Sequence, residues 1–196
     1  MKKPWLIVGL TAMLISSATA LRAADFTVAP FTYSAVGLGD FTPGRGPQAL
    51  ARWERVSGDW QLYLAKNVPT SEIAPAGAQL NGVKGISTTD LSLGFIVKEG
   101  HFGAGAPRFN IRLASGGLPI FLGCIYAPEV NGVRTFQAGL IYGGQTVPTE
   151  DVIESISIIF DEGTDQGEGF VRLDDIFVDS DLVSDTIGAA KDNRRR

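Results

Sequence analysis

The chain has 196 residues, of which 17 are basic and 21 are acidic, and its formal net charge is −4 at neutral pH. This acidic balance, with no basic stripe to neutralise phosphates, argues against a nucleic-acid partner. The 24 glycines and 10 prolines favour many short strands joined by turns over long helices. Cys124 is the only cysteine, so an exported form of the chain has no internal disulfide.

The first twenty residues predict a secretory signal peptide. Two lysines precede an apolar run over 5–15, and small residues follow it up to Ala20. Cleavage after Ala20 fits the small-residue rule through Ala18, and cleavage after Ala23 is the alternative. The apolar run is shorter than the roughly 20 residues of a membrane-spanning helix. We therefore expect an exported protein, secreted or periplasmic, with no transmembrane segment once the signal is removed.

Alternating apolar and polar residues predict ten strands. The clearest pattern lies between Leu91 and Val97, where every second residue is apolar, and it recurs between Phe109 and Leu113. The predicted strands are 25–33, 49–56, 60–66, 79–86, 89–98, 108–114, 120–126, 133–141, 155–160 and 169–178. Short helical turns are expected at 149–154 and 181–190.

These elements predict an all-β fold, a single antiparallel β-sandwich of jelly-roll type. The expected organisation is a signal peptide over 1–20, one sandwich domain over 24–180 and a C-terminal tail over 181–196. No internal repeat and no linker composition divides the domain further.

A row of polar side chains forms the best candidate ligand face. β-Sandwiches hold sugars on exposed aromatic rings flanked by hydrogen-bonding groups. Trp60 belongs to the apolar alternation of its strand, whereas Tyr63 falls on the opposite face and is the better platform. Arg108, Asn110 and Arg112 point away from the core face of their strand, so they could donate to a polyhydroxylated or acidic ligand, although solvated surface residues give the same pattern.

The pair Asp174-Asp175 interrupts the apolar strand 169–178, so one of the two carboxylates is expected to point inward. An inward carboxylate needs backbone donors, an arginine or a metal ion as a partner. Several further acids lie in turns near the C-terminus, but they match no calcium-loop consensus.

The segment Gly-Phe-Val-Arg-Leu-Asp-Asp-Ile-Phe-Val over 169–178 resembles the closing strand of galactose-binding-like jelly rolls, the sandwich shared by many carbohydrate-binding modules. The segment over 105–111 is similar to one in uncharacterised secreted bacterial proteins of this shape. The first resemblance implies a structural calcium ion at Asp174, joined by Asp25. The run of tryptophans that binds sugars in such modules is missing here.

Enzymatic functions have less support. His101 is the only histidine, and no nucleophile elbow accompanies it. Cys124 lies in an apolar run and is expected to be an inert buried thiol. A jelly-roll glycosidase needs two facing carboxylates, and no motif marks such a pair. We expect a non-catalytic, carbohydrate-binding-like module, with a structural or adhesive envelope protein that binds other proteins as the alternative.

Overall fold

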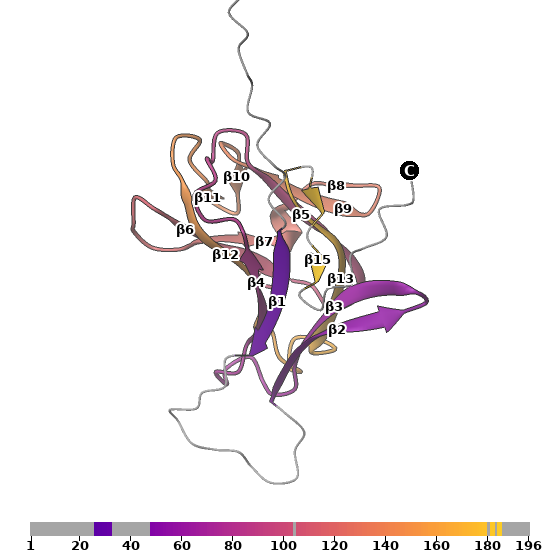
Figure 1. Cartoon of the computed structure of the whole chain (residues 1–196). Coiled ribbons are helices and arrows are strands. Elements are labelled where there is room, and N and C mark those ends of the chain that lie inside the picture. Colours follow the sequence, from indigo (N-terminus) through magenta and orange to yellow (C-terminus); the bar gives the residue numbers. More distant parts are fainter. Residues whose placement is uncertain (1–25, 33–47, 104, 180, 183, 186–196) are drawn as a thin grey trace, which may run out of the picture.

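The computed structural model describes residues 26–32, 48–103, 105–179, 181–182 and 184–185 (Figure 1). The predicted signal peptide and Asp25 lie outside this range. Within it, no helix has the length and apolar character that a membrane crossing requires.

Two sheets pack face to face to form an all-β sandwich, an architecture compatible with a jelly roll (Figure 1). The first sheet runs in the order β15 (Ser184–Asp185), β1 (Thr27–Thr32), β4 (Ala76–Asn81), β12 (Ile153–Phe160), β6 (Arg108–Leu113) and β7 (Ile120–Gly123). The second runs β2 (Ala49–Val56), β3 (Asp59–Lys66), β13 (Phe170–Val178), β5 (Ser92–Gly100), β9 (Val133–Gln137) and β8 (Glu129–Val130), with β14 (Asp181–Leu182) also paired to β13.

Nearly all pairings are antiparallel, and only β1 and β15 pair in parallel among the described strands. A small hairpin of β10 (Ile141–Tyr142) and β11 (Gln145–Thr146) pairs with neither sheet, although Tyr142 packs into the core, and a 3₁₀ turn, η1 (Cys124–Tyr126), follows β7. We call the sheet that contains β12 the first sheet and the sheet that contains β13 the second sheet.

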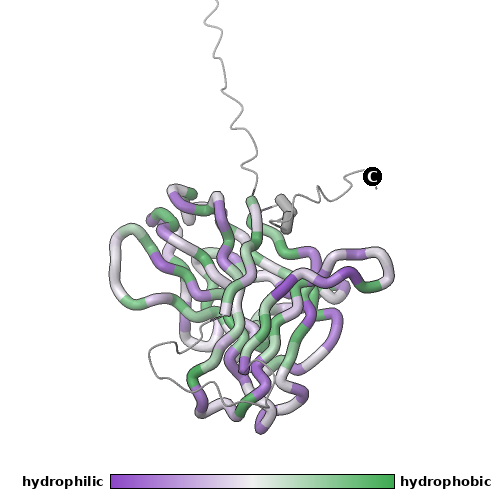
Figure 2. Tube along the Cα trace, turned by 60° about the horizontal axis from the view of Figure 1, so that its bottom comes forward, coloured by the Kyte–Doolittle hydropathy of each residue, from purple (hydrophilic) through white to green (hydrophobic). Residues whose placement is uncertain are grey.

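The core lies between the sheets and follows the predicted alternation. Leu62 and Leu64 of β3 are fully buried, as are Phe109 and Ile111 of β6. The Phe109 ring packs against rings from β5 and β9, with centroid distances of 5.2 Å and 5.7 Å. Figure 2 shows apolar segments along the packed strands, with hydrophilic residues frequent in the connections. Alternation therefore identified the buried face correctly in both sheets.

One hydrogen bond joins the sheets directly. The indole Nε1 of Trp53 on β2 donates to the carbonyl oxygen of Val28 on β1, at 3.2 Å. Both residues are buried, so this contact satisfies the polar atom that a buried tryptophan brings into the core.

Most strands lie where the sequence predicts them, and β2 has the predicted limits. The strand expected at 79–86 lies earlier, at Ala76–Asn81, because the sequence Ala-Gly-Ala before Gln79 lacks strand-forming side chains yet packs tightly between β1 and β12. Its glycine leaves room for the Phe31 ring, which a Cβ atom at Gly77 would approach to 2.7 Å.

Both expected helical turns are wrong where the structure describes them. At 149–154, the Asp151 carboxylate accepts hydrogen bonds from Ser115 and from the backbone N–H of Val152, and the chain continues as extended structure into β12. At the start of 181–190, β14 pairs with β13 and β15 pairs with β1. The sheet pairing therefore continues past residue 180, where the sequence places the end of the domain.

Candidate functional site

A pocket of about 380 Å³ lies at one end of the sandwich, where β3 of the second sheet ends and β6 of the first sheet begins. Three connecting segments contribute to it: 67–75, 105–107 and 161–169. Its lining residues are Lys66, Thr70, Ser71, Glu72, Ile73, Pro75, Gly105, Arg108, Asp161 and Glu162. We call this cavity the end pocket.

Hydrogen bonds tie the first of these segments to the third. The Asp165 carboxylate accepts from the backbone N–H of Thr70 at 2.6 Å and from its hydroxyl at 2.8 Å. These bonds hold the pKa of Asp165 below its usual value. The Thr70 hydroxyl oxygen in turn accepts from the backbone N–H of Gly163 at 2.8 Å. Thr70 therefore connects the segment 67–75 to the segment 161–169 through three hydrogen bonds.

Arg108 forms one wall of the end pocket. Its guanidinium binds the Asp161 carboxylate in a bidentate manner, with N···O distances of 2.7 Å and 2.6 Å. The Nη1 group also donates to the Gly105 carbonyl oxygen, and Nε donates to the Asn110 side-chain oxygen at 3.0 Å. A planar fork matched to a carboxylate in this way holds both side chains in a fixed orientation.

Lys66, the last residue of β3, is 1% exposed and is among the largest fully buried side chains of the protein. Its Nζ donates to the backbone carbonyl oxygens of Thr70 at 2.8 Å and Asp161 at 3.0 Å. Loss of hydration by burial lowers the pKa of this ammonium group, against the attraction of nearby acids, of which Asp161 is the strongest.

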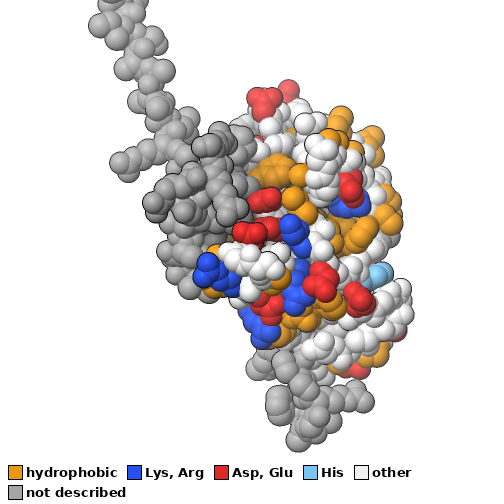
Figure 3. Space-filling model, turned by 90° about the vertical axis from the view of Figure 1, so that its right-hand side faces the viewer, with side chains coloured by type: hydrophobic (Ala, Val, Ile, Leu, Met, Phe, Trp, Pro, Cys, Tyr) orange, Lys and Arg blue, Asp and Glu red, His pale blue; other side chains and the backbone are white. Residues whose placement is uncertain are grey.

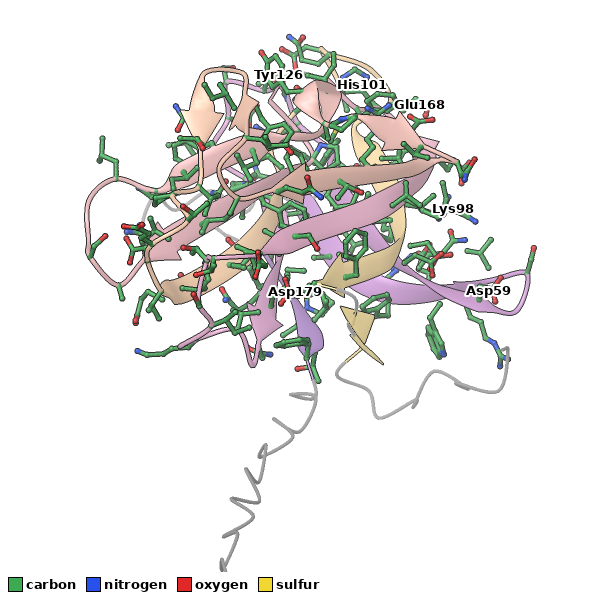
Figure 4. The ribbon with its side chains drawn as sticks, turned by 90° about the horizontal axis from the view of Figure 1, so that it is seen from above. Asp59, Lys98, His101, Tyr126, Glu168 and Asp179 are labelled. Carbon is green, nitrogen blue, oxygen red and sulfur yellow. The ribbon has the colours of Figure 1, made fainter. Side chains whose placement is uncertain are left out.

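Glu162 links the third segment to His101 and to Gly105. Its Oε1 accepts from the backbone N–H of Gly105 at 3.1 Å, and its buried Oε2 lies 2.7 Å from His101 Nε2. The geometry of this second contact is not that of a hydrogen bond, so the two atoms form a close polar contact, which is an ion pair only when the imidazole is protonated. His101 and Glu168 lie at the same end of the molecule in Figure 4, far from Asp59 at the tip of the β2–β3 hairpin.

Cys124 is close to this end of the sandwich but is chemically unreactive. Its thiol is completely buried and unpaired with another cysteine. Burial raises its pKa to about 12, so the thiolate, which is the nucleophilic form, is essentially absent at neutral pH. The structure agrees with the expectation of an inert thiol.

Tyr63 lies on the outer face of the second sheet, and arginines cover its ring. The guanidinium carbon of Arg172 is 5.0 Å from the ring centroid, and that of Arg52 is 5.6 Å away. The neighbouring Phe170 ring has its centroid 5.6 Å from that of Tyr63. Cation–π contacts of this kind occupy the ring face that a sugar would need.

The same face carries a chain of charges. Glu54 binds both Arg52 and Arg172, and Arg172 also pairs with Glu99 on β5. Burial raises the pKa of Glu54, but the two arginines outweigh this effect and lower it overall. Figure 3 shows acidic and basic side chains interleaved across this side of the molecule. We call this group the charged face.

The structure divides the predicted ligand face. Arg108 and Asn110 belong to the end pocket and its margin, whereas Arg112 is exposed farther along β6 and does not line the pocket. Tyr63 is in the other sheet. The four residues therefore do not form one surface, because strand alternation reveals which face a side chain occupies but not which sheet its strand joins.

The sequence analysis missed Lys66, although a signal for it was present. Lys66 lies two and four residues after Leu64 and Leu62 on the same strand. Since every second residue of a strand faces the same side, the alternation places this lysine on the core side. A charged residue at a position that faces the core is uncommon and marks a candidate site. Thr70 and Glu162 carried no comparable signal, because their positions depend on which loops meet.

Asp174 accepts a hydrogen bond from the backbone N–H of Asp175 at 2.8 Å, so it has a backbone donor, one of the expected partners, although its side chain does not point into the core. It is 7% exposed, and the Lys98 ammonium lies 3.8 Å from its Oδ2. Asp175, with φ of 45°, forms a bulge, so Val171 and Leu173 before it and Ile176 after it all face the core. Asp174 itself lies toward Lys98 on the outer side of the second sheet.

Only one of the two predicted calcium ligands, Asp174, lies among the described residues. Lys98 already places a positive charge beside Asp174, and no group of three or more His, Cys, Asp and Glu side chains suited to a metal occurs in the described part of the chain. Calcium needs six to eight oxygen ligands. Asp25, the second expected ligand, lies outside the described residues, so the predicted site stays untested.

No family model matches the chain, and a search among curated proteins finds no significant match. The likeness to galactose-binding-like jelly rolls therefore rests on the closing strand and on the sandwich architecture alone.

Proposed function

We propose that this protein is a non-catalytic binding module that holds a sugar in the end pocket. The observation that carries the proposal is the pocket itself, in which side chains from both sheets converge around a volume of about 380 Å³. Volumes of this order suit small polar ligands. The pocket replaces the open aromatic platform that the sequence suggested around Tyr63.

The lining has the mixture of groups that a sugar requires. Hydroxyl groups both donate and accept hydrogen bonds, and the pocket offers cationic donors in Lys66 and Arg108 and a carboxylate acceptor in Asp161. Ile73 and Pro75 supply apolar surface for the C–H face of a pyranose ring. Ile73 is 68% exposed, so it is available for this contact.

The environment of the carboxylates supports binding more than hydrolysis. A glycosidase needs one carboxyl group as a proton donor and a second as nucleophile or base. Both oxygens of Asp161 are engaged by the Arg108 fork, and Glu162 is engaged by Gly105 and His101. Neither group is placed as a free acid and base pair, so we propose no catalytic residues.

A glycan-array screen of the mature domain, followed by calorimetry with the best hit, tests this function. We expect Ile73→Ala to weaken the binding of that glycan by about fivefold to tenfold, because an aliphatic contact contributes about 1 kcal/mol. Leu118→Ala is the matched control, since Leu118 is 92% exposed on a loop that does not line the pocket. Equal effects of the two substitutions, or no glycan hit, would contradict the proposal.

The predicted structural calcium needs a separate measurement. Thermal unfolding of the mature domain with calcium and with EDTA tests it, because an ion that binds only the native state raises the melting temperature. A rise that disappears in Asp174→Asn would support the predicted ligand. The same melting temperature in both buffers would contradict the predicted calcium ion, and it would leave the proposal of sugar binding in the end pocket unchanged.

A second candidate function is adhesion to an envelope protein. Large apolar side chains are exposed around η1, among them Ile125 and Tyr126 at about half exposure and Val130 at 67%. Tyr126 lies near the periphery in Figure 4. Exposed apolar groups that lie close together are typical of protein contacts. Binding of an envelope protein that fails after Val130→Asp, together with no glycan hit, would favour this function.

A further inference from the structure

Lys66 is a buried cation whose charge has no carboxylate in contact. Among the described residues, none of the ion pairs within 4.0 Å involves Lys66, although the side chain is almost completely buried. Two of its three N–H groups bind backbone carbonyl oxygens. A buried charge without an ionic partner is costly, and a cavity beside it is the place where a partner can bind.

The acids that line the end pocket already have other contacts. Asp161 gives both oxygens to Arg108, and Glu162 contacts Gly105 and His101. Glu72 is exposed on the loop above the pocket and has no ion pair with Lys66. The lining therefore contains two cations, Lys66 and Arg108, and only Asp161 among its three carboxylates pairs with one of them.

We propose that the end pocket binds a carboxylate group, held by the remaining N–H of Lys66 and the remaining Nη2–H of Arg108. The inference rests on the proposed function and narrows it to acidic sugars such as uronic acids. Arg108 has one such N–H because its other four donate to Asp161, Gly105 and Asn110. Two cationic donors match the two oxygens of a carboxylate.

The surrounding charges favour a monoanion. The cations Lys66 and Arg108 lie beside Asp161, and Glu72 and Glu162 bring the summed formal charge of the lining to −1. A doubly charged phosphate or sulfate would meet more repulsion from these acids than a single carboxylate does. A neutral sugar would leave the Lys66 charge without a partner.

The experiment is calorimetry or NMR titration of the mature domain with matched pairs of small ligands. Galacturonate and glucuronate are compared with galactose, glucose and the methyl esters of both acids. Because hydrogen bonds to charged groups contribute about 1.5–3 kcal/mol, we expect each acid to bind at least about tenfold more tightly than its ester. Acetate and sulfate are titrated as simple anions.

Lys66→Met removes the charge and keeps much of the side-chain volume. We expect it to lower the affinity for the acid to that for the ester, whereas the control Lys84→Met, at an exposed lysine far from the pocket lining, leaves the difference intact. If Lys66→Met fails to fold by circular dichroism, the comparison of acid and ester on the wild-type domain decides the question.

The outcomes separate this inference from the proposed function. Equal binding of acids, esters and neutral sugars would overturn the carboxylate and leave the sugar-binding function standing. Binding of acetate as strong as that of the uronates would support the carboxylate and contradict the sugar. Binding of sulfate alone, or no binding, would overturn the inference, and no binding to any sugar would also contradict the function.

Discussion

Gly163 lies where the third segment of the end pocket meets the first. A Cβ atom at this position would lie 2.5 Å from the carbonyl carbon of Pro69 and 2.6 Å from the backbone nitrogen of Thr70. Backbone atoms cannot move aside as a side-chain end can. The absence of a side chain at Gly163 therefore permits the close approach that shapes the pocket.

We predict that Gly163→Ala destabilises the protein by about 1–3 kcal/mol, the range typical of overpacking. Chemical denaturation measures the free energy of unfolding. Gly105→Ala is the control, because a Cβ atom there would meet only the Glu162 side chain, at 3.2 Å. If Gly163→Ala lowered the free energy of unfolding no more than Gly105→Ala does, the two loops would not be packed against each other as described.

At the scale of single residues, the sequence predicted part of the site. The outward direction of Arg108 followed from alternation, and it is correct. The bidentate contact with Asp161 could not be predicted, because 53 residues separate the two partners and their meeting depends on the neighbouring positions of β6 and β12. Tyr63 was placed on the correct face, but the arginines above it come from adjacent strands.

At the scale of strands, the charged face connects β2, β13 and β5 through Glu54 and Arg172. The lowered pKa of Glu54 means that the folded state favours the ionised carboxylate. This stabilisation is fully present above about pH 4.3, the usual pKa of glutamate, and is lost as the pH falls through the lower pKa of the folded state.

We predict that Glu54→Gln lowers the free energy of unfolding by about 0.5–1 kcal/mol at pH 7, a range typical of exposed and partly exposed ion pairs. The difference from wild type is expected to shrink as the pH falls below about 4.3, because protonation removes the same charge. Urea denaturation at pH 7 and pH 3 measures it. Lys84→Met, which breaks the exposed ion pair between Lys84 and Glu154 of β12, controls for general charge effects. A constant difference at both pH values would contradict the role of the Glu54 charge.

The bulge in β13 also belongs to the scale of strands. The sequence predicted that Asp174-Asp175 conflicts with a regular strand and that one carboxylate points inward. The conflict is real, but the inward carboxylate is wrong. The structure resolves it by changing the register at Asp175, so neither carboxylate enters the core and the apolar residues on both sides still face inward. Bulges of this kind depend on the partner strand, so their exact form is not visible in a single sequence.

At the scale of the whole molecule, the last described residues connect the two sheets. β14 pairs with β13 in the second sheet, and β15 pairs with β1 in the first. The sequence predicted the fold class correctly because strand alternation is local, but it treated this segment as a tail because two-residue strands have no detectable period.

We predict that a chain ending at residue 180 melts about 2–8 °C lower than the full chain, as expected for the loss of about 1–2 kcal/mol in a domain of this size. A chain ending at residue 186 retains β14 and β15 and is expected to melt like the full chain. Circular dichroism of the three proteins gives the melting temperatures. Equal melting of the two shortened chains would contradict a stabilising role for this pairing.

The order of strands also determines when the chain can fold. β12 lies between β4 and β6, and β13 lies between β3 and β5, so an inner strand of each sheet is synthesised late. A growing chain can form hairpins such as β2–β3, but neither sheet can close before residues 153–178 are available. Contacts between distant parts of a sequence also form slowly. The two sheets can therefore be completed only after most of the described chain has been synthesised, whereas local hairpins can form earlier.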